Sequence, residues 1–220
     1  MQYLSQRLAS KPAKAPGVGP PSGSLGADQR RRILDAAERL VGERGCGGTS
    51  IEAIVKAAGV SSVTFYEHFA DKEACFVAAF DRAVVEAGAE LSAAGTGEGG
   101  WADRVRAVLA ALLAAVAAEP DRARLCLVEA QTGGQLLSAR YDATVDAAAS
   151  RLRQGRLLAT APRDLPGTVE EAAVGGIAWL LRRRIERGEA ETVGELLPKL
   201  VEIALSPYQG VAETPTAADG

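Results

Sequence analysis

The sequence predicts an all-α protein, in which an N-terminal three-helix domain with a helix-turn-helix precedes a larger helical domain. Apolar residues recur at helical spacing along most of the chain. No run of Val, Ile and Thr alternates with polar residues at a period of two, so strands are not expected. Glycine and proline gather in the breaks between the apolar segments.

Composition limits the class of protein further. The 220 residues have a formal net charge of −3, and the three cysteines form no CxxC pair, so neither a disulfide framework nor a zinc site is expected. The longest apolar stretch, residues 105–118, is shorter than the roughly 20 residues of a membrane span. No nucleophile–base pair, metal cluster or phosphate loop is visible, so no catalytic residue, metal or cofactor is predicted.

Two terminal segments differ from the rest. Residues 1–27 combine Pro, Gly, Ser and Ala with a few basic side chains and lack the apolar segment of a signal peptide, so we expect a disordered basic tail and a cytoplasmic protein without a membrane partner. Residues 209–220 are expected to form a second disordered tail.

The first predicted helix has one apolar face and a clear end. Its apolar residues follow the spacing i, i+3, i+4, i+7 and i+8 from Ile33 to Val41. Arg44 and Gly45 provide a basic last turn and a helix-ending glycine.

Two short helices follow it. Thr49 and Glu52 have the spacing of a capping box and predict the start of the second helix. Gly59 is suited to the left-handed conformation that ends a helix, and Ser61 is suited to cap the third one directly afterwards. Two short helices joined by a tight glycine turn are typical of a helix-turn-helix, which we place within residues 28–73.

The third helix has two different faces at 100° per residue. Phe65 and Phe69 share the face of Ser61, toward the first two helices. The opposite, hydroxyl-rich face suits reading of the DNA major groove. It carries Ser62, Val63, Thr64, Tyr66, Glu67 and His68. Alternatively, the serines are only helix caps, Tyr66 is a half-buried core residue, and His68 is an ordinary hydrogen-bonding residue.

The run TSIEAIVKAAGVSSVTFYEHFADKEACFVAAF resembles the N-terminal domain of the tetracycline-repressor-like (TetR) family of bacterial transcriptional regulators. The matching elements are Ala58-Gly59-Val60-Ser61, the segment from Thr64 to Phe69, and Lys72-Glu73. Residues 124–130 and 175–208 resemble a subgroup of the same family. The resemblance implies an all-helical homodimer with a DNA-binding domain at 28–73 and a ligand-binding and dimerisation domain at 74–208.

The resemblance also implies roles for single residues. Thr64, Tyr66, His68 and Lys72 match positions that touch bases or phosphates, and Ser50 and Ser61 match hydroxyl positions near the DNA backbone. Ser62-Val63 stands where Lys-Gly is frequent and Glu52 where a basic residue is frequent, which implies a shallower salt dependence of binding. The basic arm at residues 30–32 is expected to compensate.

The helices of the second domain have two possible roles. Their apolar residues form an ordinary core, or, as the resemblance implies, the helices surround an effector. Trp101, Leu109 and Leu113 are the apolar candidates for an effector pocket. Cys126, Glu129 and Gln131 are the candidates for its polar side chains.

Residues 168–205 carry two apolar stripes and a glycine pair within a helix. The stripes either complete the monomer core or cover a partner, and the resemblance implies a four-helix dimer interface. The interface candidates are Val174, Gly175, Gly176, Ile177, Leu181, Leu197, Leu200 and Val201.

The predicted function is that of a dimeric regulator that binds a palindromic double-stranded operator and is released by a small hydrophobic or amphipathic effector. The alternative is a helical ligand-binding dimer without sequence-specific DNA function, which the balanced charge of residues 27–72 permits. An enzyme ranks third.

Overall fold

The computed structural model describes residues 24–158, 161–162 and 164–209, and every regular element in these residues is helical, which confirms the all-α prediction. The α-helices are α1 (Ser24–Gly48), α2 (Ile51–Ala58), α3 (Ser62–His68), α4 (Lys72–Ala94), α5 (Trp101–Ala118), α6 (Pro120–Leu127), α7 (Gln135–Leu152), α8 (Val169–Glu186) and α9 (Leu197–Leu205). The 3-10 turns are η1 (Glu129–Gln131), η2 (Arg153–Leu157), η3 (Ala190–Leu196) and η4 (Ser206–Tyr208).

Helix α1 starts earlier than the sequence indicated. Residues 24–27 were assigned to the tail, but they form the first turn of α1. Asp28 lies one turn in and forms ion pairs with Arg31 and Arg32, which favours helix here because side chains three and four residues apart are neighbours. The remainder of the two predicted tails, residues 1–23 and 210–220, lies outside the described residues.

The predicted end of the first helix is confirmed at Gly45, where φ is 74° and ψ is 168°. The backbone is non-helical at this position, although helical hydrogen bonding resumes as far as Gly48. A left-handed φ of this kind favours glycine. The chain therefore changes direction at Gly45 before it enters α2.

The start of α2 corrects the predicted capping box. Ser50, not Thr49, is the N-cap, and its Oγ accepts a hydrogen bond from Ala53 N at 3.2 Å. Thr49 is buried and donates its hydroxyl to Gly45 O at 2.9 Å. Thr49 is therefore engaged by the α1 break, which leaves the cap to the next hydroxyl in the sequence.

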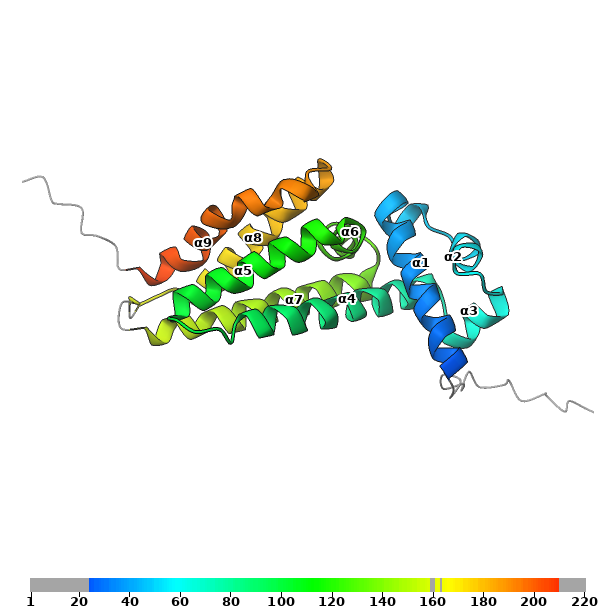
Figure 1. Ribbon diagram of the computed structural model, residues 1–220, viewed down its shortest axis with the longest axis horizontal. Helices are drawn as coiled ribbons and strands as arrows, with labels where there is room; N and C mark the ends of the chain where they lie inside the picture. Colours follow the sequence, from blue (N-terminus) through cyan, green and yellow to red (C-terminus); the bar gives the residue numbers. More distant parts are fainter. Residues whose placement is uncertain (1–23, 159–160, 163, 210–220) are drawn as a thin grey trace, which may run out of the picture.

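The buried apolar side chains form two hydrophobic cores. The first fills the N-terminal head, which we define as α1–α3, and includes the N-terminal half of α4 together with Leu125, Ala130 and Leu137. The second lies among α5, α6, α8 and α9. Helix α4 runs from the head into the second domain, α5–α9, and packs against α7 there (Figure 1). We call α5–α9 the regulatory domain after the role that the sequence predicts for it.

None of the helices in the described ranges combines the length and apolar character that a bilayer span requires. The same residues hold no group of three or more His, Cys, Asp or Glu side chains arranged for a metal ion.

Candidate nucleic-acid interface

The turn between α2 and α3 is built by residues close together in the sequence. Gly59 has φ 63° and ψ 41°, as predicted, and its N–H donates to the carbonyl of Lys56 at 3.4 Å. Ser61 caps α3, as predicted, by accepting a hydrogen bond from Thr64 N at 3.0 Å. Arg32 of α1 donates to the carbonyls of Ala58 and Gly59 at 3.0 and 3.4 Å, which holds the turn against α1.

Two phenylalanines anchor α3 from below. Phe65 is fully buried, Phe69 is nearly so, and their ring centroids are 5.5 Å apart. The Arg30 guanidinium lies 5.4 Å from the centre of the Phe69 ring. Because α3 has less than two complete turns, these contacts fix its orientation more than its own hydrogen bonds do.

The opposite face of α3 is open, as the helical wheel indicated. Val63 is 70% exposed and Tyr66 is 58% exposed, so the core alternative for Tyr66 is wrong. Ser62 and Glu67 are exposed beside them. Thr64 is half-buried, and its hydroxyl lies 3.0 Å from that of Ser61. A short helix thus presents hydroxyl, carboxylate, methyl and phenol groups on one accessible surface, which we call the reading face.

His68 differs from its neighbours on that helix. Both ring nitrogens are buried and have no hydrogen-bond partner among the described residues. Burial lowers the pKa of His68, and the nearby Arg30 charge lowers it further. The neutral imidazole is therefore favoured, so the structure gives His68 little capacity to contribute positive charge to a phosphate contact.

Lys72 is the first residue of α4, but its ammonium is directed at protein carbonyls. Its Nζ donates to Cys46 O and to Thr49 O, each at 3.3 Å. These bonds use two of the three ammonium donors and leave one available. Ser50, the remaining predicted contact, is exposed at the start of α2, close in sequence to this site.

The basic arm at residues 30–32 is occupied within the head. Arg30 lies over Phe69, Arg31 pairs with Asp28, and Arg32 holds the α2–α3 turn. The side chains of Arg31 and Arg32 are still 65% and 41% exposed.

The six predicted effector residues are dispersed in the structure. Leu109 and Leu113 belong to the second core, and Trp101 packs edge-on against Tyr208 with ring centroids 4.9 Å apart. Cys126 packs against the first core, and burial, followed by the charge of Glu38, raises its thiol pKa to about 12. Glu129 and Gln131 form hydrogen bonds to the head and to α8.

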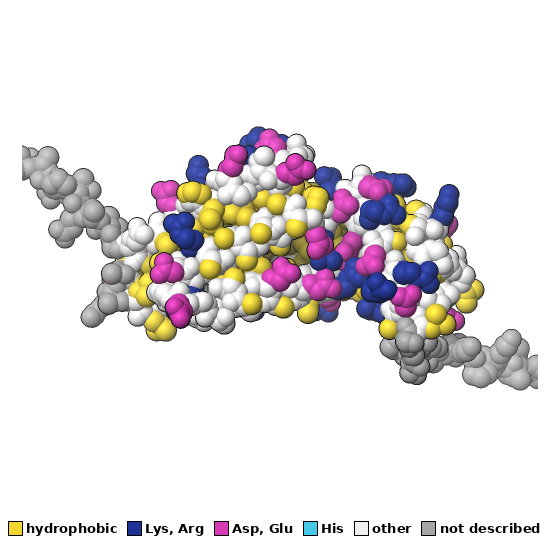
Figure 2. Space-filling model, viewed as in Figure 1, with side chains coloured by type: hydrophobic (Ala, Val, Ile, Leu, Met, Phe, Trp, Pro, Cys, Tyr) yellow, Lys and Arg dark blue, Asp and Glu magenta, His cyan; other side chains and the backbone are white. Residues whose placement is uncertain are grey.

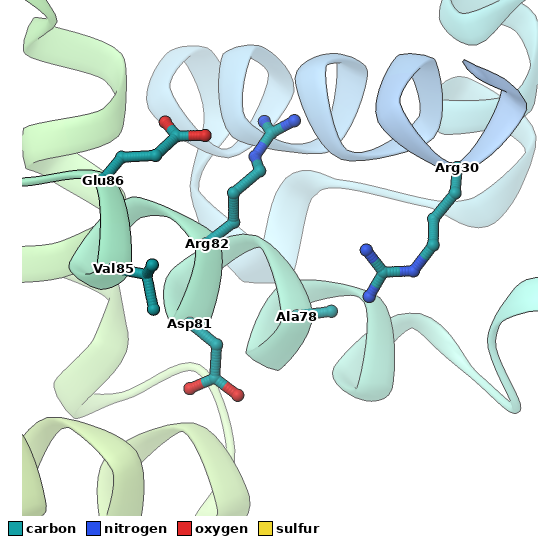
Figure 3. A pocket seen from close by; sticks show the side chains of 6 residues that line it. All are labelled: Arg30, Ala78, Asp81, Arg82, Val85 and Glu86. Atoms are coloured by element: carbon teal, nitrogen blue, oxygen red, sulfur yellow. The ribbon is translucent and has the colours of Figure 1, made fainter. Parts of the chain in front are cut away.

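None of these six residues lines either of two open surface hollows. One lies between α1 and α4, where Figure 3 shows Arg82 reaching from α4 toward α1. The other is bordered by α1 and the α5–α6 junction.

Four of the predicted dimer-interface residues lie in the interior of the chain. Ile177, Leu181, Leu200 and Val201 are buried within the chain, where they belong to the second core, so their side chains are not available to a partner. This outcome matches the alternative that the apolar stripes complete the monomer core. Val174 and Leu197 are half-buried. Gly175 and Gly176 border open space, since a Cβ built on either meets no atom within 4 Å.

A charged network that sequence reasoning missed joins the head to the regulatory domain. Glu38 of α1 is buried and accepts hydrogen bonds from Arg82 of α4 at 2.6 Å and Arg122 of α6 at 3.3 Å. Arg122 also pairs with Glu86 at 3.0 Å. Figure 2 shows acidic and basic side chains gathered at this junction. The partners lie 44 and 84 residues apart, a separation at which the sequence carries no pairing signal.

Comparison with known proteins agrees with this geometry. Residues 33–79 match the model of the tetR family of bacterial regulatory proteins. Over 62 residues the chain is 39% identical to the HTH-type transcriptional regulator EthR of Mycobacterium tuberculosis, covering 28% of this chain and 29% of EthR. Over 49 residues it is 45% identical to the HTH-type transcriptional regulator AcrR of Shigella flexneri, covering 22% of this chain and 23% of AcrR. These matches thus span less than a third of either relative.

The whole fold also resembles solved structures. The transcriptional regulator FadR of Bacillus subtilis, solved in complex with stearoyl-CoA, superimposes with a TM-score of 0.71 at 16% sequence identity, covering 80% of this chain and 98% of FadR. At this identity the likeness concerns the fold. Residues 33–79 thus form a domain of the tetR family of bacterial regulatory proteins, and the whole chain shares the fold of the FadR regulator.

Proposed function

We propose that this chain is a ligand-responsive transcriptional repressor that binds a palindromic operator through α3. The observation that carries this proposal is the exposed reading face, with Val63, Tyr66 and Glu67 presented on a helix that Phe65 and Phe69 hold in place. The dimensions of a helix suit the major groove, where hydroxyl, carboxylate and apolar groups distinguish base edges. A role on genomic DNA places the protein in the cytoplasm.

Selection of bound fragments from random duplex DNA tests this proposal. We expect the purified full chain to enrich a pseudo-palindrome whose half-site centres lie about 10 bp apart or a multiple of that distance. A double variant, Val63→Ala with Tyr66→Ala, removes side chains from the reading face but leaves the phenylalanine anchors. It is expected to enrich nothing. Failure of the wild-type protein to enrich any sequence would favour the alternative, a ligand-binding dimer without sequence-specific DNA function.

We further propose a dimer formed by the outer face of α8, together with α9 beside it. Gly175 and Gly176 leave that face flat, and Trp179 is 53% exposed next to them, with Arg183 stacked 4.6 Å from its ring centre. A flat glycine surface beside an exposed tryptophan allows two helices to approach closely.

The dimer is tested by light scattering on two matched variants. Gly176→Leu places a bulky side chain on the proposed interface, and its monomer has room for this side chain. Gly88→Leu makes the same change on α4, where a built Cβ also meets nothing within 4 Å. We expect Gly176→Leu to be monomeric and Gly88→Leu to remain dimeric. Equal dimerisation of both variants would place the interface elsewhere.

We also propose that the effector is hydrophobic or amphipathic and enters among the helices of the regulatory domain. Support comes from the apolar character of these helices and from the similar fold of the FadR structure that contains stearoyl-CoA. Thermal-shift measurements with stearoyl-CoA, with coenzyme A as the control, test the class of ligand. A shift with stearoyl-CoA alone supports it, whereas equal shifts would indicate binding of the nucleotide part only.

A further inference from the structure

The turn η1 of the regulatory domain contacts the N-terminal head through Glu129. The carboxylate Oε2 of Glu129 accepts a hydrogen bond from the backbone N–H of Cys46 at 2.9 Å. Its other oxygen, Oε1, lies 3.4 Å from Nη2 of Arg124 on α6. The Glu129 side chain is only 13% exposed, so both interactions are largely shielded from water.

The backbone carbonyl of Cys46 is hydrogen-bonded as well as its N–H. The carbonyl of Cys46 accepts from Lys72 Nζ at 3.3 Å, and Lys72 begins α4. Cys46 thus bonds to η1 of the regulatory domain through its N–H and, through its C=O, to the first residue of α4, four residues after α3 ends. The position of this one peptide segment depends on both domains.

Close packing leaves this segment little freedom. A Cβ built on Gly45 would lie 2.9 Å from Oε2 of Glu129, and one built on Gly133 would lie 2.8 Å from the Sγ of Cys46. Both distances are shorter than real Cβ contacts. The left-handed Gly45 lets the backbone approach the carboxylate, and Gly133 lets the turn after η1 lie against the thiol.

The opposite end of η1 contacts α8. The side-chain oxygen of Gln131 accepts from Arg182 Nη1 at 3.0 Å, and its Nε2 donates to Leu127 O at 3.2 Å. η1 therefore lies between the helix that we propose for the dimer and the junction of α1 with α2. Because both ends of η1 are hydrogen-bonded, we expect a shift of η1 to move the head relative to α8.

We propose that Glu129 is a positioning residue that sets the angle of the head and thereby the half-site spacing that the dimer accepts. This inference rests on the proposed function. Glu129 touches no DNA; it acts through Cys46 and Lys72. The contrast with Glu38 supports this role. Glu38 is held by arginine side chains from α4 and α6, whereas Glu129 bonds directly to the head backbone where the chain changes direction.

The test compares spacing selectivity with base selectivity on a selected operator. One base pair inserted or deleted between the half-sites rotates one of them by about 34° and moves it by about 3.4 Å. We expect the wild-type protein to lose at least about tenfold in affinity on such an operator, and Glu129→Ala to lose less than about threefold. Single-base changes within a half-site are expected to weaken both proteins equally.

Three further variants define the role. Glu129→Gln keeps a side-chain oxygen that can accept from Cys46 N–H, so it is expected to restore wild-type spacing selectivity. Glu129→Asp keeps the charge but is one methylene too short, so it is expected to behave like Glu129→Ala and replaces it if the alanine variant does not fold. Glu171→Ala is the control, because Glu171 pairs with Arg153 at 2.7 Å within the regulatory domain and has no hydrogen bond to the α1–α2 junction.

The outcomes separate the two proposals. Wild-type spacing selectivity in Glu129→Ala or Glu129→Asp overturns the positioning role while the DNA-binding function stands. Altered base preference in these variants also overturns it, since Glu129 would then influence reading itself. If the wild-type protein selects no DNA sequence, the proposed function fails, and the positioning role fails with it.

Discussion

The helices of the head and those of the regulatory domain begin in different ways. Ser50 and Ser61 cap α2 and α3 of the head, and Asp71 caps α4 where it leaves the head. Each of these side chains accepts a hydrogen bond from a backbone N–H within the first turn. Helices α6, α7, α8 and α9 have no such side-chain cap. The head is thus specified by contacts between sequence neighbours, whereas the position of each regulatory helix depends on packing against distant ones. A reading platform needs the first kind of order, and a domain that responds to a ligand benefits from the second.

The largest expected effect comes from core truncation in each region. Phe65→Ala is expected to destabilise the head by about 3–5 kcal/mol, and Leu200→Ala the regulatory domain by about 2–5 kcal/mol, since both side chains are fully buried. Both tryptophans, Trp101 and Trp179, lie in the regulatory domain. In urea, Phe65→Ala should therefore lower the circular-dichroism midpoint but not the tryptophan-fluorescence midpoint. Coincident shifts in both signals would mean that the two regions unfold as one unit.

Variants of two residues near the reading face distinguish contact with the DNA phosphates from reading of the bases. Lys72→Ala is expected to weaken binding to all sequences equally and to reduce the log-log salt slope by about 1. Glu67→Ala is expected to change preference at one or two base pairs by about 1–3 kcal/mol. Binding to a panel of single-base operator changes at two salt concentrations measures both effects. A uniform gain in affinity for Glu67→Ala would identify this carboxylate as a repulsive neighbour of the phosphates.

Ser61 and Thr168 both occupy the N-cap position of a helix, so their alanine variants compare the stability that a cap contributes in each region. Ser61→Ala removes the cap of α3 and is expected to cost about 1 kcal/mol of stability. Thr168 occupies the N-cap position of α8 but forms no cap hydrogen bond, so Thr168→Ala is expected to stay within about 0.5 kcal/mol of wild type. Chemical denaturation of both variants measures the difference. A comparable loss for Thr168→Ala would contradict the contrast between the regions.

Acid should affect the two regions in separate pH windows. The pKa of His68 is lowered in the fold, so the unfolded head binds the extra proton first, and its stability falls as the pH drops below about 6.5. Hydrogen bonding to Arg156 and then to Tyr208 lowers the pKa of Glu170 despite its burial. The contribution of Glu170 is complete above about pH 4.3 and is lost as the pH falls through the lowered value.

Thermal melts at graded pH test this order. His68 is the sole histidine of the sequence, so His68→Gln should remove the decline that begins near pH 6.5, while leaving the Glu170 window unchanged. Persistence of the decline in that variant would assign it to another group.

The sequence predicted the head more completely than the regulatory domain. The Gly59 turn, the Ser61 cap and the two-faced α3 were each read from residues a few positions apart. The Thr49 cap was wrong because a contact with Gly45 competes for its hydroxyl. Within α8 and α9, apolar spacing identified the stripes but not whether a partner or the chain itself covers them. Glu38 and Glu129 were inaccessible to sequence reasoning as links between the domains, because their partners lie up to 84 residues away.

The aromatic end of the described chain has a consequence for truncation. Tyr208 is buried against Trp101, and its hydroxyl lies 2.9 Å from Oε1 of Glu170 and 3.0 Å from Leu152 O. A chain shortened to end before Tyr208 would leave a buried carboxylate without one of its two hydrogen-bonding side chains and expose the indole ring. Removal of this tyrosine by a carboxypeptidase would therefore open the far end of the helical bundle.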